Sequence, residues 1–258
     1  MKANQRAILP NTLTFANLCL GFFAILLFSQ GRYITGAWLM AVAGIFDGLD
    51  GAAARLVKSS SKFGGQVDSL ADLVSFGVAP ATLVFHMLFD HMGFWPAAML
   101  ASLPLLTAAT RLARFNVLSE AHGHGNGFSG MPSPAAASMF ASFFIYAHYD
   151  ADGFNTLPIW LSLVFLVSLL MITPIPYRRM PVVPLHGAKH PSIAIAVIVL
   201  TTALLLINIR FFFFPLMVMY LLTGPIEWMI HQITQVRDRI KIVEVDDERR
   251  PRRRRNSR

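Results

Sequence analysis

The sequence predicts an all-α protein, a bundle of helices that crosses a membrane. Three observations predict it: 55% of the 258 residues are hydrophobic, only 14% are charged, and the mean hydropathy is +0.53. A soluble domain of this length carries about 25% charged residues. The composition therefore excludes a soluble globular enzyme and a disordered chain. The single cysteine, Cys19, excludes a disulfide framework.

Apolar runs follow one another along most of the chain. A helix needs about 20 apolar residues to cross a bilayer, and we expect about eight such spans. They are residues 12–30, 33–54, 67–89, 94–116, 134–149, 156–174, 192–209 and 211–232. We expect the first to be an uncleaved span rather than a signal peptide, because no small-x-small cleavage pattern follows it.

The basic residues predict how these spans are oriented. With the N-terminus inside, 20 of the 22 Lys and Arg residues fall on the inner side, and only Arg32 and Arg210 fall outside. This distribution follows the positive-inside rule. We therefore expect a multi-pass protein of the cell inner membrane, with both termini and the active site facing the cytoplasm.

Charge also divides the chain into two expected parts. Ten of the 22 basic residues lie between Arg237 and the C-terminus. We expect a membrane domain over residues 1–236 and a charged, Arg-rich cytoplasmic tail over residues 237–258, without a fixed structure. The tail is either a solvated end or a segment attracted to anionic membrane lipids. Nucleic acid is not an expected partner, because no folded platform lies beside the arginines.

Four aspartates occur where the hydropathy predicts hydrocarbon, and there a charge costs about 3 kcal/mol. Asp47 and Asp50 share a face of one helix at i, i+3 spacing, and Asp68 and Asp72 share a face of the next at i, i+4. Two adjacent helices can thus direct four carboxylates to one place, where they repel unless cations neutralise them. Mg²⁺ or Mn²⁺ suits such oxygen ligands; one or two ions would fit, and we expect two.

The residues beside these aspartates suit a substrate that contains phosphate. Gly51 leaves room next to Asp50, and Arg55 offers a planar cation to a phosphate group. Metals, an arginine and a cavity at the level of the lipid indicate transfer of a phosphate-containing group to or from a lipid. The alternative from another class is a divalent-cation transporter, although Arg55 would oppose the passage of cations.

This part of the chain resembles the signature of the CDP-alcohol phosphatidyltransferase family. The matching positions are Asp47, Asp50, Gly51, Ala54, Arg55, Gly64, Asp68 and Asp72. The resemblance implies a membrane bundle that transfers a phosphatidyl group from a CDP-linked donor to an alcohol and releases CMP. It also implies that all four aspartates bind the metals, that Asp72 is the general base, and that the protein is a homodimer.

The resemblance further implies a site for CDP-diacylglycerol. Gly51 and Arg55 would contact the CDP portion, and Ser61 its phosphates. The opening Pro10-Asn11-Thr12-Leu13-Thr14 is similar to the family's segment that closes over the nucleotide, which implies contacts from Asn11 and Thr12. The alternative for these two residues is that one of them caps the first helix.

A second pair of cations bears on the acceptor alcohol. Arg111 and Arg114, at i, i+3 spacing before Asn116, can bind a phosphate or a carboxylate, or can anchor the helix at the membrane surface. The glycine and prolines of residues 128–137 predict a shaped loop before the fifth helix. Together with the opening segment, these stretches resemble the phosphatidylserine synthase branch of the family. That resemblance implies L-serine as the acceptor, with Arg111 and Arg114 binding it; choline, inositol or glycerol phosphate is the alternative.

Overall fold

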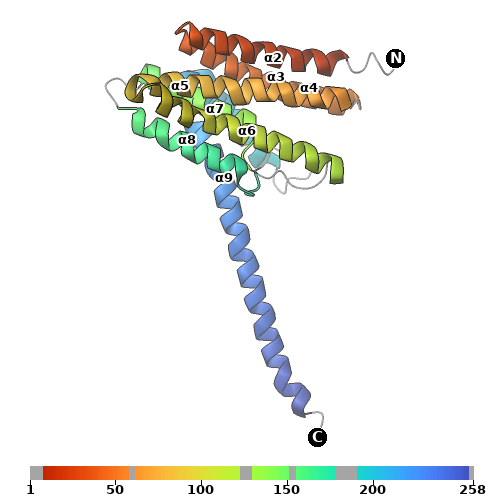
Figure 1. Ribbon diagram of the computed structural model, residues 1–258. Coiled ribbons are helices and arrows are strands. Elements are labelled where there is room, and N and C mark those ends of the chain that lie inside the picture. Colours follow the sequence, from red (N-terminus) through yellow and green to blue (C-terminus); the bar gives the residue numbers. More distant parts are fainter. Residues whose placement is uncertain (1–7, 58–61, 123–129, 151–154, 178–190, 256–258) are drawn as a thin grey trace.

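The computed structural model describes residues 8–57, 62–122, 130–150, 155–177 and 191–255. Side chains are described for residues 11–53, 63–118, 130–149, 155–177 and 199–235. Over these residues the fold is a bundle of helices, as the composition predicts (Figure 1). In chain order the helices are α2 (Ile8–Ser29), α3 (Tyr33–Val57), α4 (Lys62–Leu73), the π-helical turn η1 (Val74–Val78), α5 (Ala79–Met92), α6 (Phe94–His122), α7 (Ser133–Asp150), α8 (Leu157–Ile172) and α9 (Pro191–Arg255).

Each expected span coincides with a helical segment of this order. The third expected stretch falls on three consecutive elements, α4, η1 and α5, and the last two expected stretches fall on the two halves of α9. The halves meet at Asn208, whose backbone is not helical (φ −155°, ψ 89°). The Asn208 side-chain oxygen accepts a hydrogen bond of 3.2 Å from the Phe211 N–H, so it caps the second half.

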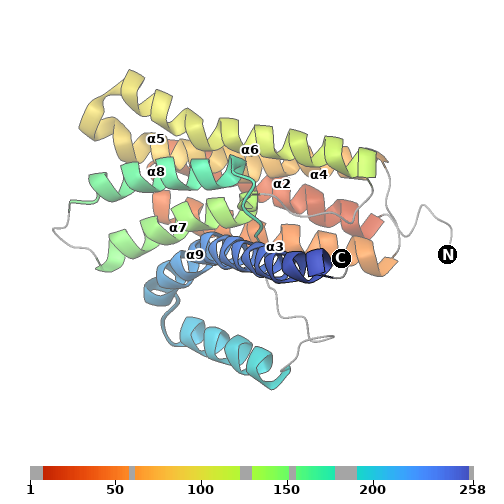
Figure 2. The same cartoon turned by 90° about the horizontal axis from the view of Figure 1, so that it is seen from below.

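The axes of helices α2 to α8 are roughly aligned, so these helices pack side by side (Figures 1 and 2). The core lies around α7, where every side chain of residues 135–137 and 139–145 is buried. Three consecutive alanines, Ala135 to Ala137, leave space for the neighbouring helices to approach. Trp160 of α8 stacks on Phe140 at a centroid distance of 6.4 Å, and Phe214 of α9 contacts Phe143 at 5.2 Å.

Four helical stretches of the described chain are long and apolar enough to cross a membrane. They are Asn11–Ser29, Phe63–Met92, Phe94–Leu118 and Val199–Gln235, and Leu157–Ile172 is a shorter apolar helix. Large apolar side chains on these helices are exposed, for example Trp95 at 73% and Leu206 at 82%. A soluble protein does not carry so much apolar surface, and lipid tails accept it. The protein is therefore embedded in a membrane.

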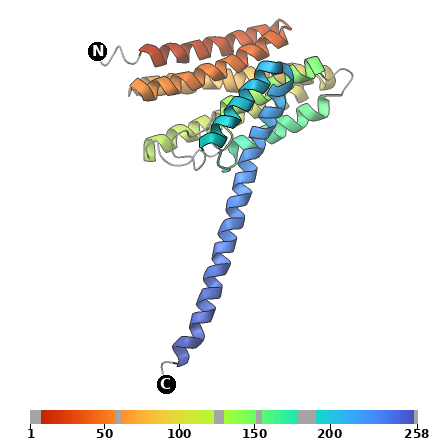
Figure 3. The same ribbon diagram turned by 180° about the vertical axis from the view of Figure 1, so that it is seen from behind.

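The second half of α9 leaves the bundle and carries the C-terminus away from it (Figure 3). The expected boundary at residue 237 falls inside this helix, which runs to Arg255, and the division into domain and tail stays a prediction. Tyr177 attaches α9 to the connection that follows α8, because its hydroxyl donates a hydrogen bond of 2.8 Å to the Leu221 carbonyl. Burial raises the pKa of Tyr177 to about 12, so the hydroxyl stays protonated at neutral pH.

The entry to α7 depends on Gly130. This residue has a φ of +86°, and a Cβ there would lie 2.2 Å from the Met171 carbonyl oxygen, so a side chain meets backbone that cannot move aside. The Gly130 N–H donates to the Ile175 carbonyl and the Met131 N–H to the Leu170 carbonyl, both at 2.9 Å. These bonds fix the start of α7 against the end of α8.

We predict that Gly130→Ala destabilises the protein much more than Gly93→Ala. Gly93 has a φ of +76° with a ψ of −177°, a conformation essentially restricted to glycine, and no atom lies within 4 Å of the position that a Cβ would take, so Gly93→Ala reports backbone strain alone, about 1–3 kcal/mol. Gly130→Ala adds the clash to that strain. Thermal unfolding of the two variants in the same detergent measures the difference; equal midpoints would contradict the role given to the Gly130 contact.

Candidate metal centre and active site

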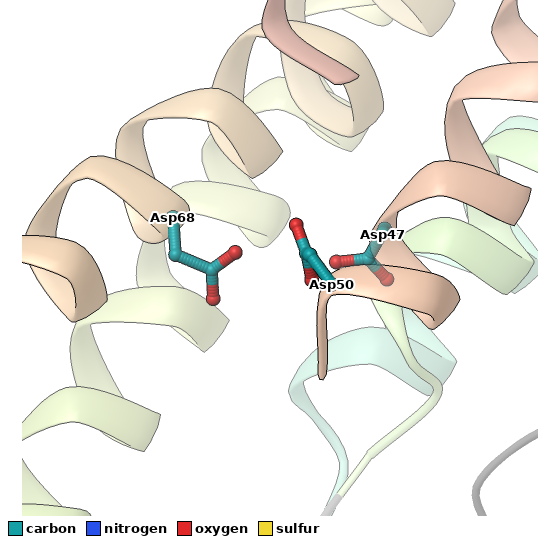
Figure 4. Close-up of side chains that lie close together, drawn as sticks. All are labelled: Asp47, Asp50 and Asp68. Atoms are coloured by element: carbon teal, nitrogen blue, oxygen red, sulfur yellow. The ribbon is translucent and has the colours of Figure 1, made fainter. Parts of the chain in front are cut away.

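The aspartates come from two neighbouring helical segments. Asp47 and Asp50 lie on α3, and Asp68 lies on α4. One carboxylate oxygen from each of these three residues lies within 4.8 Å of the others (Figure 4). The carboxyl group of the fourth, Asp72, is hydrogen-bonded to that of Asp47. The helical spacing thus brings all four acids into one connected group.

The donor set of this group fits a hard divalent cation. Asp50 is only 5% exposed, so water screens the group poorly. The Asp68 Oδ1 atom is buried and has no hydrogen-bond partner among the atoms that the structure describes. Several carboxylates this close together repel unless a cation lies between them, and Mg²⁺ and Mn²⁺ prefer oxygen ligands of this kind. The three clustered aspartates can therefore hold a metal ion.

Helix α2 supplies two donors that the sequence analysis did not select. The Thr14 hydroxyl donates a hydrogen bond of 3.0 Å to Asp50 Oδ2, and the Asn17 side-chain amide donates one of 3.4 Å to Asp72 Oδ1. Both residues are buried, at 6% and 0% exposure. The available signal was their i, i+3 spacing, which places two polar side chains on one face of a strongly apolar helix.

The residues expected to bind the CDP part are described only in part. Asn11 is half-buried and Thr12 exposed on the first turns of α2; because the helix begins at Ile8, the alternative that either residue caps it is wrong. Gly51 is half-buried directly after Asp50. The backbone of Arg55 belongs to α3, one turn beyond Gly51, while its side chain lies outside the described residues, as does the whole of Ser61.

The two arginines of α6 have different partners. Arg111 is buried, donates a hydrogen bond of 3.2 Å to the Ser133 hydroxyl at the start of α7, and interacts electrostatically with Asp72 and Asp47. Arg114 donates a hydrogen bond of 3.2 Å to the Ile172 carbonyl at the C-terminal end of α8. A cation at that end of a helix stabilises its carbonyl groups. Arg111 is therefore the arginine that belongs to the aspartate group.

A further contact joins α6 to α4 beside Asp68. The Asn116 amide donates a hydrogen bond of 2.9 Å to the Ser69 hydroxyl. Ser69 follows Asp68 on α4, so this bond holds the helix segment that carries a candidate metal ligand. The sequence analysis placed Asn116 with the acceptor arginines, whereas the structure shows a contact with the helix of the aspartates.

We predict that metal binding stabilises the wild-type protein and not the Asp50→Asn variant. A ligand at 100 times its dissociation constant stabilises a folded protein by about 2.7 kcal/mol. Asn keeps the shape of the side chain and removes a charged ligand. Thermal unfolding with and without Mn²⁺ measures this gain. Asp90→Asn, at an exposed acid on α5, is the control and should retain the full gain; an equal gain in Asp50→Asn would contradict the assignment.

Comparison with known proteins agrees with this geometry. The sequence model of the CDP-alcohol phosphatidyltransferase family matches residues 7–168, a stretch that contains all four aspartates and both arginines. The CDP-diacylglycerol–serine O-phosphatidyltransferase of Helicobacter pylori strain 26695 is 34% identical over 179 residues, which cover 69% of this chain and 74% of that protein.

Two archaeal proteins are also similar. The archaetidylserine synthase of Methanothermobacter thermautotrophicus is 37% identical over 176 residues, covering 66% of this chain and 70% of that protein. The CDP-diacylglycerol–serine O-phosphatidyltransferase of Methanocaldococcus jannaschii is 32% identical over 216 residues, covering 84% of this chain and 92% of that protein. The family match extends over more than half of the chain and includes the complete aspartate group, so the protein belongs to the CDP-alcohol phosphatidyltransferase family.

Proposed function

We propose that this protein transfers the phosphatidyl group of CDP-diacylglycerol to the hydroxyl of L-serine, giving phosphatidylserine and CMP. The observation that carries the proposal is the position of Arg111, which is buried and interacts with Asp72 and with Asp47, one of the three aspartates that can hold a metal. A phosphate-transfer site beside a buried guanidinium suits an acceptor that carries a carboxylate. The names of the similar proteins from Helicobacter pylori and Methanocaldococcus jannaschii support serine as that acceptor.

Asp47, Asp50, Asp68 and Asp72 would hold two divalent cations, Mg²⁺ or Mn²⁺. When bound, such cations neutralise negative charge on the phosphates and stabilise the leaving CMP. The donor set is consistent with this use, because the Asp68 Oδ1 atom is buried without a hydrogen-bond partner among the described atoms. Asp50 is in turn held by the Thr14 hydroxyl, which fixes one of its oxygens.

Other residues of the chain would transfer the proton and bind the substrates. Asp72 accepts the proton of the serine hydroxyl, whose oxygen attacks the phosphorus that carries diacylglycerol; the bond from that phosphorus to CMP breaks. Gly51 gives the CDP portion room to approach α3. Arg55 and Ser61 would bind phosphate oxygens, and Asn11 and Thr12 would close α2 over the nucleotide.

Arg111 would bind the serine carboxylate. Its bond to Ser133 fixes the guanidinium at the start of α7, and the planar fork of a guanidinium suits the two oxygens of a carboxylate. Arg114, which donates to the end of α8, would instead hold the helices around this position.

The membrane arrangement belongs to the same proposal. We infer eight spans in the cell inner membrane with both termini in the cytoplasm, because the helical segments coincide with the eight expected spans and 20 basic residues fall on one side. The aspartates then lie near the cytoplasmic ends of α3 and α4, where soluble serine arrives, while the acyl chains stay in the lipid. A homodimer is the expected assembly.

Two alternatives are separated from this proposal by direct assays. CMP release measured with serine, choline, inositol and glycerol phosphate identifies the acceptor, and serine should be the best. A carboxylate-lined transporter would move divalent cations into sealed vesicles without CDP-diacylglycerol. Metal-dependent CMP release without such a flux supports the transferase; the reverse result would overturn it.

We predict that Arg111→Lys raises the serine KM by about tenfold or more while the KM for CDP-diacylglycerol changes little. Lysine keeps the charge but loses the two-pronged geometry that matches a carboxylate, and a lost charged hydrogen bond of about 1.5 kcal/mol corresponds to a factor of ten. Steady-state CMP release in detergent, with each substrate varied in turn, measures both constants.

Arg114→Lys is the matched control. Lysine also stabilises a helix C-terminus, so this variant should keep the serine KM of the wild type. Serine methyl ester, which lacks the carboxylate charge, should be a poor acceptor for the wild type. The rate of CMP release with this ester should fall little further in Arg111→Lys. An unchanged serine KM in Arg111→Lys would show that another group binds the carboxylate.

A further inference from the structure

Asn17 is a polar side chain that is fully buried inside the helix bundle. It lies on α2 with 0% exposure. Its side-chain amide donates to Asp72 Oδ1 at 3.4 Å, and its own Oδ1 is buried without a hydrogen-bond partner among the described atoms. The amide thus presents its NH₂ group to Asp72 and leaves its own oxygen unsatisfied. Leaving a buried acceptor unsatisfied costs stability.

The backbone of the same residue is held as well. The Ser75 hydroxyl donates a hydrogen bond of 2.9 Å to the Asn17 carbonyl, and both groups are buried. Ser75 belongs to the π-helical turn η1, which begins two residues after Asp72. A π-helical turn carries one extra residue, is uncommon and occurs frequently at functional sites. Asn17 therefore contacts the helix of Asp72 twice, once through its side chain and once through its main chain.

Gly21 makes this double contact possible. A Cβ at position 21 would lie 2.2 Å from the Ser75 hydroxyl oxygen and 2.6 Å from the Ser75 Cα, so α2 and η1 touch through their backbones. Gly21 lies one helical turn after Asn17, on the same face of α2. The π-helical turn, the glycine and the asparagine thus form one close junction directly beside Asp72.

We propose that Asn17 is a positioning residue for Asp72, which rests on the role of Asp72 as the general base proposed above. The amide holds one carboxyl oxygen of Asp72 and thereby restricts the orientation of the carboxyl group, and the Ser75 bond fixes the backbone of Asn17. Thr14, three residues earlier, makes the corresponding bond to Asp50. Helix α2 therefore supports the base through Asn17 and a metal ligand through Thr14.

The first test is Asn17→Leu, which keeps the branched shape and the number of side-chain heavy atoms and has no donor. Loss of a supporting hydrogen bond at such a site typically lowers activity by about 10- to 100-fold. We expect kcat for CMP release to fall by such a factor, while the KM values for serine and CDP-diacylglycerol stay within about twofold. Such a separation of kcat from both KM values is not expected of a general loss of structure.

Two variants on α2 serve as controls. Thr14→Val should raise the Mn²⁺ concentration for half-maximal activity, because it releases Asp50, and should reduce the Mn²⁺-induced rise in the thermal unfolding midpoint. Cys19→Ala, at an exposed position of the same helix, should change neither quantity.

Ser75→Ala keeps the test decisive if Asn17→Leu does not fold. It removes only the hydroxyl that holds the Asn17 carbonyl, so it should lower kcat by a smaller factor with the same unchanged KM values. Where both variants fold, the factor by which kcat falls in the double variant should be smaller than the product of the two single factors. Both substitutions act through the same contact between Asn17 and Asp72.

The outcomes separate this inference from the proposed function. Wild type that releases CMP only with another acceptor refutes serine as the substrate, and the variants are then compared with that acceptor. Wild type without any CMP release refutes the transferase and with it the role of Asn17. Active wild type with an unchanged kcat in Asn17→Leu, or with a loss confined to a KM value or to the unfolding midpoint, overturns the role of Asn17 alone.

Discussion

The mutual repulsion of four carboxylates inside an apolar bundle is the constraint on which the rest of this structure depends. Their charge is opposed from three directions. Thr14 and Asn17 donate from α2, Arg111 lies buried on α6, and the donor set between the helices suits a divalent cation. A charge in hydrocarbon is costly, and the aspartate group lies where these elements meet.

Close approach of the helices is what allows them to meet. Gly21 lets the backbones of α2 and η1 touch, and the buried alanines at the start of α7 let α3 and α8 approach the same centre. Gly130 admits the turn that places Ser133 beside Arg111. Small residues therefore determine how near the polar side chains come to one another, while the polar side chains themselves determine what can bind there.

Sequence reasoning recovered the parts of this arrangement that follow from helical periodicity. The i, i+3 and i, i+4 spacings predicted that α3 and α4 would present their aspartates together, and hydropathy placed the helical segments, including the break at Asn208. Contacts between distant segments could not be predicted in the same way. Thr14 and Asn17 are single polar residues in an apolar helix, and in isolation such side chains bond equally well to their own backbone.

The π-helical turn is a second feature that helical periodicity in the sequence could not predict. A regular α-helix through residues 62–92 would keep one register from Asp68 to the end of α5, and no feature of the composition indicates an extra residue at Val74–Val78. The two arginines illustrate the same limit, since equal spacing on one helix did not reveal that Arg111 meets Ser133 while Arg114 meets the end of α8. Which neighbour a side chain meets depends on where the other helices cross.

The position of α2 gives these contacts a common consequence. Thr14, Asn17 and Gly21 lie at successive helical turns on one face, so they move together if α2 moves. The first turns of the same helix carry Asn11 and Thr12, the residues expected over the nucleotide. Because helix α2 is continuous from Ile8 to Ser29, a displacement at its nucleotide end changes the hydrogen bonds to Asp50 and Asp72 at the same time. If Asn11 and Thr12 contact the nucleotide as proposed, donor binding and the orientation of Asp50 and Asp72 are linked through helix α2.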